Sequence, residues 1–280
     1  MKRFLFICLC YFGAVPGVLN AQLSESASSR LTDDKGALSL IGPELPTSKG
    51  APTAVLTTSV TLPRMAPEFA LQVLQGHAQL QSAELAGYSA TTVIHAQLPD
   101  TAQSGEYQLK RSYSAPRTLV FKALRFTGDS FVKSNIILRV LQSEVDHVQK
   151  DDPALTAISA ANYKFSYKGT NSLNQRVVHV YQIKPREKRA GLFKGKIYVD
   201  AYTGTLARAE GKLVRSPSLF VKRLEFVQDY ADIDSFTFPV HIHSEAQARV
   251  VGRTVVDIYE QDYQPVSVNS TQASATLPGH

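Results

Sequence analysis

Polar and apolar residues alternate along most of the chain from residue 87 onward. Successive side chains of a β-strand point to opposite faces of a sheet, so a period of two indicates strands with one buried face. These segments are also rich in β-branched and aromatic residues, which favour extended structure. We expect strands at 89–97, 107–113, 118–126, 163–167, 176–184, 195–200, 206–214, 224–230, 236–243 and 254–263.

Two other segments repeat their apolar residues at the spacing of a helix. The first begins near Pro67, a residue that is favoured at helix starts. Its shared apolar face would carry Phe69, Val73 and Leu80. The second spans 131–148 and is ended by the Asp-Asp-Pro sequence at 151–153. Its apolar stripe would consist of Ile137, Leu141, Val145 and Val148.

Short turn sequences separate the later strands, as at Tyr202-Thr203-Gly204 and Ser216-Pro217. Consecutive strands with short connections pair as an antiparallel meander. Two helices inserted into such a sheet predict an α+β fold.

The segment 236–243 has an unusually clear alternation. Pro239 interrupts it, and proline has no N–H group to donate to a neighbouring strand. This segment is therefore predicted to be an edge strand or to carry a bulge. Its shared apolar face would consist of Phe236, Phe238, Val240 and Ile242.

Residues 1–21 have the three-part layout of a secretory signal peptide. Lys2 and Arg3 precede an uncharged apolar run over 4–18, and small Ala21 marks the expected cleavage site. The run is shorter than the ~20 apolar residues that span a bilayer. We expect export to the periplasm with cleavage near Ala21. The alternative is a signal anchor in the inner membrane, because Leu19 occupies a position that is usually small.

Cleavage would remove Cys8 and Cys10, the two cysteines of the chain. The mature protein would then have no disulfide, zinc–cysteine site or catalytic thiol. Residues 22–60 are rich in small and polar residues and predict a flexible leader. The folded domain is expected over 61–266, and a disordered tail over 267–280.

The charge of the chain is mildly basic and evenly spread. Without Lys2 and Arg3, the formal net charge of +6 becomes +4. Such a charge does not indicate a nucleic-acid partner. It is compatible with attraction to anionic lipid surfaces.

One pattern is a candidate for metal binding. His241, His243 and Glu245 would project from one face if their strand continues, a spacing that suits a zinc-type site. The alternative is the polar outer face of an ordinary strand, which the same alternation produces. We favour the second interpretation and expect no cofactor.

A second candidate is the basic segment 184–196, which contains six basic residues and one acidic residue. An apolar tip among basic residues could contact an anionic lipid surface or an acidic partner. The alternative, which we favour, is a solvated hairpin whose phenylalanine folds back onto the sheet. The contact residues would be Lys188, Arg189, Phe193 and Lys194.

Some predicted strands are apolar on both faces, as in 176–184 with its Val177, Val178, Val180, Tyr181 and Ile183. Such a strand is either covered on both sides or lines a cavity for an apolar ligand. Motifs of common enzymes are absent from the sequence, including the Gly-x-Ser-x-Gly elbow, phosphate-binding glycine loops and dinucleotide fingerprints. We therefore expect a protein that is not an enzyme.

The sequence resembles the LolA/LolB-like superfamily of periplasmic proteins that sort outer-membrane lipoproteins. The resemblance covers roughly 63–265 and includes Gly191–Gly211. It is most specific at Ile197–Gly204, followed by Ala207–Glu210, where a strand, an aspartate and a glycine turn precede a returning strand. The segments 236–243 and 252–257 resemble the closing strands of that family.

The resemblance implies a curved antiparallel sheet, an incomplete β-barrel whose open side is covered by the two helices. It also implies an apolar cavity for the acyl chains of lipoproteins or lipids, and it transfers no catalytic residue. The expected lining consists of Phe165, Tyr167, Val178, Val180, Ile197, Val199, Phe226, Phe236, Phe238, Val240 and Ile242.

Three functions are compatible with these observations. The first is a periplasmic carrier of an acylated lipoprotein or lipid. The second is an envelope sensor that binds lipoproteins and an inner- or outer-membrane protein. The third, which we favour least, is a metal-dependent envelope enzyme that uses His241 and His243.

Overall fold

The computed structural model describes residues 63–216, 221–249 and 251–269. The expected signal peptide, the leader and most of the expected tail lie outside the described residues. The described strands are β1 Leu85–Leu98, β2 Gln103–Ser114, β3 Thr118–Gly128, β4 Tyr163–Leu173, β5 Arg176–Pro185, β6 Phe193–Asp200, β7 Leu206–Leu213, β8 Val221–Ile233, β9 Phe236–Ala248 and β10 Gly252–Ser267.

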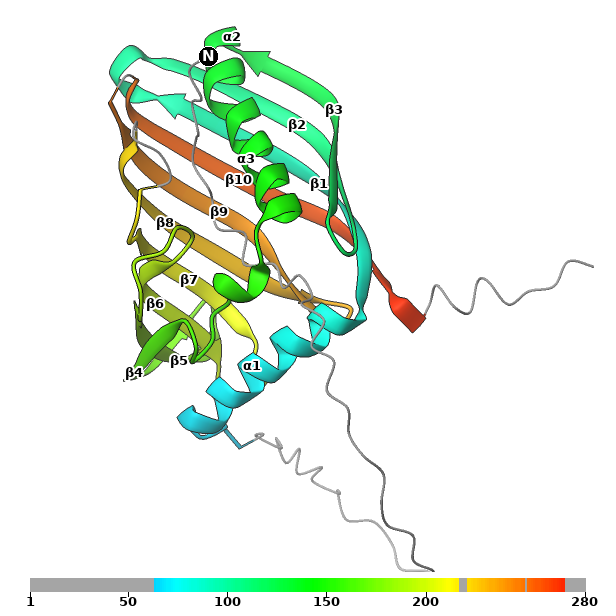
Figure 1. Cartoon of the computed structure of the whole chain (residues 1–280), viewed down its shortest axis with the longest axis vertical. Helices are drawn as coiled ribbons and strands as arrows, with labels where there is room; N and C mark the ends of the chain where they lie inside the picture. The colour runs from blue at the N-terminus through cyan, green and yellow to red at the C-terminus, as the bar shows by residue number, and fades with distance from the viewer. Residues whose placement is uncertain (1–62, 217–220, 250, 270–280) are drawn as a thin grey trace, which may run out of the picture. The chain divides into compact units, whose positions relative to one another are not determined.

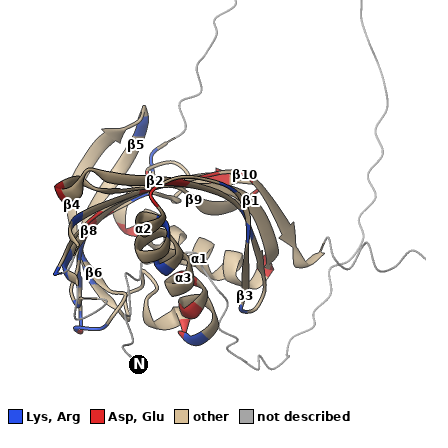
Figure 2. Cartoon of the chain, turned by 90° about the horizontal axis from the view of Figure 1, so that it is seen from above, with Lys and Arg blue, Asp and Glu red and all other residues tan. Residues whose placement is uncertain are grey.

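The strands form one antiparallel sheet in the order β3-β2-β1-β10-β9-β8-β7-β6-β5-β4 (Figure 1). β10 lies between β1 and β9 and so joins the first three strands to the meander β4–β9. β3 and β4 are the two edges, so the sheet is open. Viewed from above, it bends around the helices (Figure 2). The expected α+β fold with a curved, open antiparallel sheet is confirmed.

Two main helices cover the face of the sheet that we call the concave face (Figure 2). Helix α1 spans Pro67–Glu84. The second helical region consists of the short α2, Ser130–Val132, a π-helical turn at Lys133–Ile137, and α3, Leu138–Lys150. No helix among the described residues is both long and apolar enough to cross a bilayer.

The main hydrophobic core lies between these helices and the concave face. Strand alternation directs Ile94, Leu109 and Ile242 inward, and the helices contribute Leu74 and Leu141. Each of these side chains is buried. A second, smaller cluster lies near the start of β1 and contains Leu85, Ala90, Phe236, Phe238 and Tyr263.

The predicted inner face of α1 is wrong. Phe69 and Leu80 are 54% and 58% exposed, whereas the buried residues of the helix are Ala70, Leu74 and Gln81. The small Ala70 allows the helix backbone to approach the sheet closely. The outer stripe is apolar as well, so hydrophobic spacing alone pointed to the wrong side of the helix.

The second helical region follows its prediction more closely. Ile137 and Leu141 are buried, as expected from the apolar stripe. The structure adds that Glu144, one turn after Leu141, is buried on the same side. A charged residue therefore occupies a position that faces the sheet.

Strand β9 is not an edge strand, because it pairs with both β8 and β10. The bulge alternative is confirmed: the pairing with β8 shifts register where Tyr230 faces Pro239. The Tyr263 hydroxyl lies 2.7 Å from the Pro239 carbonyl oxygen. The bulge accommodates the missing proline N–H within an interior strand.

Candidate functional site: an apolar groove beside buried charges

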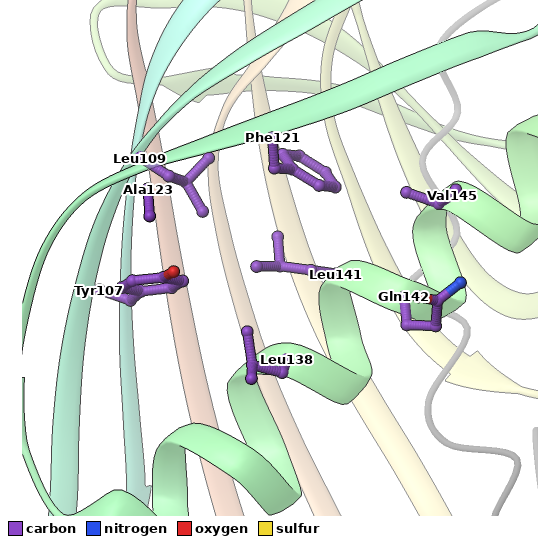
Figure 3. Close-up of a pocket in the computed structure, with 8 residues that line it drawn as sticks. All are labelled: Tyr107, Leu109, Phe121, Ala123, Leu138, Leu141, Gln142 and Val145. Atoms are coloured by element: carbon purple, nitrogen blue, oxygen red, sulfur yellow. The ribbon is translucent and has the colours of Figure 1, made fainter.

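An apolar groove of about 330 Å³ lies between α3 and the strands β2 and β3 (Figure 3). The figure shows side chains of the helix and of the two strands directed toward one another across it. Its size is at the lower end of the ~300–1,000 Å³ that is typical of ligand sites. The lining residues are Tyr107, Leu109, Phe121, Ala123, Leu138, Leu141, Gln142 and Val145.

The local sequence explains why these residues converge. Alternation along β2 places Tyr107 and Leu109 on the concave face. In the neighbouring strand, Ala123 pairs directly with Leu109. On α3, Leu138 and Leu141 are three residues apart, so their side chains share the face that meets the strands. The groove is thus built by two regular patterns that face each other.

The groove is open on one side because β3 is an edge strand. Leu138, in its wall, is 41% exposed. When an apolar ligand covers an apolar side chain that is in contact with water, the free energy of the complex is lowered.

A buried charged cluster adjoins the groove on the concave face. Arg111 of β2 donates from Nη1 to Glu260 of β10 at 3.1 Å, and from Nη2 to Glu144 of α3. Its Nε donates to the Tyr88 hydroxyl at 2.9 Å. The Tyr263 hydroxyl also contacts Glu260. The side chains of the arginine and the two glutamates are at most 5% exposed.

The cluster contains one guanidinium and two carboxyl groups, so their charges do not balance when both carboxyls are ionised. Burial raises the pKa of Glu144 to about 7, although Arg111 acts in the opposite direction. Burial also raises the pKa values of Tyr88 and Tyr263. Both phenols therefore remain protonated and can donate hydrogen bonds at neutral pH.

The groove and the cluster share neighbouring residues. Phe121, which lines the groove, pairs with Arg111 across β2 and β3. The guanidinium carbon lies 5.5 Å from the centre of the Phe121 ring. On α3, Glu144 precedes Val145 and lies one turn after Leu141, both of which line the groove. The apolar lining therefore ends at the charged cluster.

The structure places the predicted cavity residues elsewhere. Phe165, Ile197, Val199, Phe226 and Ile242 belong to or pack against the main core. None of the residues expected to line the cavity lines this groove. Phe236 and Phe238 lie in the smaller cluster.

Two other predicted lining residues, Val178 and Val180, also differ from expectation. Val180 pairs with Tyr198 while Tyr181 pairs with Ile197, so Val178 and Val180 lie on the face opposite Ile197. Their assignment to the same lining as Ile197 and Val199 is wrong.

Two residues at irregular points are less buried. Tyr167 is exposed, and its hydroxyl lies 3.2 Å from Nδ1 of His179. Val240 is half-buried, next to the register shift at Pro239. The bulge interrupts the alternation from which a shared face with Ile242 was expected.

The basic segment 184–196 is attached to the preceding loop rather than projecting from the sheet. Arg186 donates to the Ala160 carbonyl at 2.8 Å, and Arg189 to the Leu155 carbonyl at 3.0 Å. Lys188 and Lys194 are exposed.

Phe193 is fully buried, so its proposed surface contact is wrong. Its ring centre lies 5.0 Å from that of Phe226 and 5.8 Å from that of Tyr163. Strand alternation explains this position, because Phe193 shares the inward phase of Ile197 on β6.

The histidine pair lies among acidic residues on the opposite face of the sheet. His243 Nδ1 is 2.8 Å from Asp257 Oδ1, and His241 Nε2 is 3.3 Å from the same atom. Glu245 is paired with Arg253 at 3.0 Å. Across the described ranges, no group of three or more histidine, cysteine or acidic residues is arranged to hold a metal ion.

Sequence reasoning missed Arg111, Glu144 and Glu260. The signal was present in the phase of each residue: Arg111 follows Tyr107 and Leu109 at two-residue intervals, and Glu260 follows Ile258. A charged residue in the apolar phase of a strand indicates a buried, paired charge.

Comparison with known proteins gives a partial family match. The model of the "Family of unknown function (DUF5686)" matches residues 155–264, which contain most of the described strands from β4 to β10. No curated protein matches the chain.

Several solved structures are similar. A DUF1329 family protein from Desulfovibrio piger has 11% identity and a TM-score of 0.40, covering 75% of this chain and 98% of that one. A domain described as an outer membrane lipoprotein-sorting protein, from Vibrio parahaemolyticus, has 12% identity and a TM-score of 0.40, covering 74% and 98%. A LolA superfamily protein from Nitrosomonas europaea has 11% identity and a TM-score of 0.35, covering 71% and 93%.

Proposed function

We propose that the protein binds an apolar, acylated ligand, either a lipid or the acyl chain of a lipoprotein, and carries it in the periplasm. The observation that carries this proposal is the groove between α3 and the strands β2 and β3. Its walls are apolar apart from Gln142 and the Tyr107 hydroxyl, and it opens to solvent beside an edge strand.

The energetics of an acyl chain suit such a groove. Each methylene that leaves water for an apolar site contributes about 0.8 kcal/mol. About ten buried methylenes would thus contribute roughly 8 kcal/mol, which corresponds to a Kd of about 1 µM before the entropic cost of binding. A groove of about 330 Å³ therefore suits one acyl chain that binds reversibly.

The chemistry of the site favours binding over catalysis. Arg111, Glu144 and Glu260 are buried, and both glutamates accept hydrogen bonds from Arg111. Because these groups are engaged, they support the position of the helix rather than a reaction. We therefore propose a function without a catalytic step or a cofactor.

A second candidate is a sensor that binds lipoproteins and a membrane-protein partner. The exposed stripe of α1 favours it, since Phe69 and Leu80 lie outside the groove and face solvent. Exposed apolar residues of this kind are typical of protein contacts. Purification with an added affinity tag tests this candidate: a membrane protein that is retained by the wild type and lost with Leu80→Asp would support it.

The carrier proposal is tested by two measurements on the full chain. Native mass spectrometry of the protein from its own envelope should show co-purified lipid mass. Titration with a fluorescent fatty acid should show saturable binding. A ligand-free spectrum together with no fatty-acid binding would refute the proposal.

A pair of variants tests the location of the site. Leu138→Arg places a charge at the open side of the groove and should weaken fatty-acid binding at least tenfold. Val120→Arg is the matched control, because Val120 is also exposed but belongs to the opposite face of β3 from Phe121. Equal binding by the two variants would place the ligand elsewhere.

A further inference from the structure

The cluster around Arg111 joins three separate parts of the fold. Arg111 belongs to β2, Glu260 to β10 and Glu144 to α3. Both carboxyl groups contact the same guanidinium, and all three side chains are excluded from water. Within these three described side chains, one positive charge faces two carboxyl groups, so ionising both would leave a net negative charge among the three.

A buried uncompensated charge is costly, and two events can relieve it. One carboxyl group can hold a proton, or one can move into water. Glu260 is poorly placed to move, because β10 is hydrogen-bonded to β1 on one side and to β9 on the other. The Tyr263 hydroxyl also contacts Glu260.

Glu144 is the carboxyl group that can move. Its helix, α3, is not paired to a strand by backbone hydrogen bonds. It is attached at the apolar core, at Arg111, and at its end, where Arg117 of the β2–β3 turn donates to the Gln149 carbonyl at 3.2 Å. Rotation or partial release of α3 would carry Glu144 into water and leave a balanced Arg111–Glu260 pair. The excess negative charge therefore weakens the attachment of α3 to the sheet.

We propose that the attachment of α3 to the sheet is controlled by one proton in the Arg111–Glu144–Glu260 cluster: the helix is held at acidic pH and loosens above neutral pH. This inference is independent of the proposed ligand, because it concerns the protein alone.

The surroundings of Glu144 define the proton's site. Burial raises the pKa of Glu144 to about 7, and Arg111 is the main opposing influence. The charged and titratable groups that act on this cluster are Arg111 on β2, Glu260 and Tyr263 on β10, Tyr88 on β1, and His147 on α3 itself.

The direction of the effect follows from linkage. A glutamate that has a pKa of about 7 when docked and 4.5 when exposed binds its proton more tightly in the docked state. The proton on Glu144 therefore stabilises the docked state of α3 fully below about pH 4.5. This stabilisation is lost as the pH rises through about 7. These two pKa values give about a 30-fold increase in the opening equilibrium between about pH 5.5 and 8.5.

Amide hydrogen exchange of the full chain, without ligand, measures this equilibrium. The protection of residues 138–150 is followed between about pH 5.5 and 8.5 after correction for the intrinsic exchange rate. Glu144→Gln, which has no titrating group at this position, serves as the reference at each pH. We expect protection in α3 of the wild type to fall about 30-fold relative to that variant. An unchanged ratio across this pH range would refute the proposal.

Two neutral variants and one control assign the effect to Glu144. Glu144→Gln and Glu144→Met remove the titrating group and should give protection in α3 that no longer varies with pH. Asp146→Asn removes a carboxylate that pairs with Lys150 on the same helix, at 2.8 Å, and should retain the wild-type pH dependence. Retained dependence in whichever neutral variant folds, or its loss in Asp146→Asn, would overturn the assignment.

Discussion

The side-chain amide of Gln81 and the backbone of Thr237 exchange two hydrogen bonds. Gln81 Nε2 donates to the Thr237 carbonyl at 3.1 Å, and Gln81 Oε1 accepts from the Thr237 N–H at 2.9 Å. The amide thus makes the contacts that a residue of a neighbouring strand would make. Gln81 is buried, so this exchange ties the end of α1 to the start of β9.

Replacing Gln81 by alanine should lower the free energy of unfolding by about 1–3 kcal/mol, because two backbone groups of Thr237 lose their partners. Urea unfolding measures the change. Gln79→Ala is the control on the same helix, since Gln79 is exposed and should change stability by no more than about 0.5 kcal/mol. Equal losses in the two variants would show that the exchange contributes nothing specific.

Gly204 is predicted to be intolerant of a side chain. It has a φ of +72°, and a Cβ atom there would overlap Val73 of α1. Gly204→Ala should cost about 2 kcal/mol or more, from backbone strain and from the overlap. In a Val73→Ala background the overlap with Cγ1 is removed, but Cβ of residue 73 remains 2.8 Å away. The cost of Gly204→Ala should therefore fall but stay above the backbone strain of about 1 kcal/mol. A double-mutant cycle by chemical unfolding checks this, and additive effects would contradict the contact.

Phe193 should behave as a core residue. Phe193→Ala should cost about 3–5 kcal/mol, because the removed ring leaves a cavity beside Phe226 and Tyr163. Lys194→Ala, the exposed neighbour, should remain within about 0.5 kcal/mol of the wild type. If thermal or urea unfolding showed a small effect for Phe193→Ala, the buried position of the ring would be wrong.

The stability of the whole protein should also depend on Glu144. Its pKa is raised to about 7 in the folded chain, from 4.5, so its contribution is fully present below about pH 4.5 and is lost as the pH rises through 7. Glu144→Gln should therefore gain stability relative to the wild type between about pH 5 and 8, by roughly 2.5 kcal/mol, because most of the pKa difference, at about 1.4 kcal/mol per unit, takes effect within this range. Urea unfolding at several pH values measures this difference. A constant difference would contradict the raised pKa.

The strands could be predicted from the sequence because their alternation is a local property. The bulge at Pro239 was predictable for the same reason, since it follows from the chemistry of one residue. The buried face of α1 was not, because both of its faces carry apolar residues. The face that contains Ala70 is buried because its small side chain lets the helix approach the sheet closely. This depends on the shape of the opposing surface, which the sequence of the helix does not contain.

The groove was harder to predict than the fold. Its walls come from segments that do not adjoin in sequence, such as Leu109 and Leu138, and a cavity is the space that packing leaves between them. The resemblance directed attention to the strands from β4 to β9, whose inward side chains instead fill the core. The charge at Arg111 marked the correct strand, although its partners could not be named from the sequence.

The position of β10 has a consequence for the kinetics of folding. Strands β1–β3 are joined to the meander only through β10, and its contact with β1 links residues as distant as Ser89 and Gln264, 175 positions apart. The entropy of closing such a long loop is lost before the β1–β10 contacts form and stabilise the chain, and this makes folding slow. Until then the hairpins on either side leave unpaired edges and apolar faces in water. During synthesis and refolding, this interval is when the chain most needs protection from aggregation.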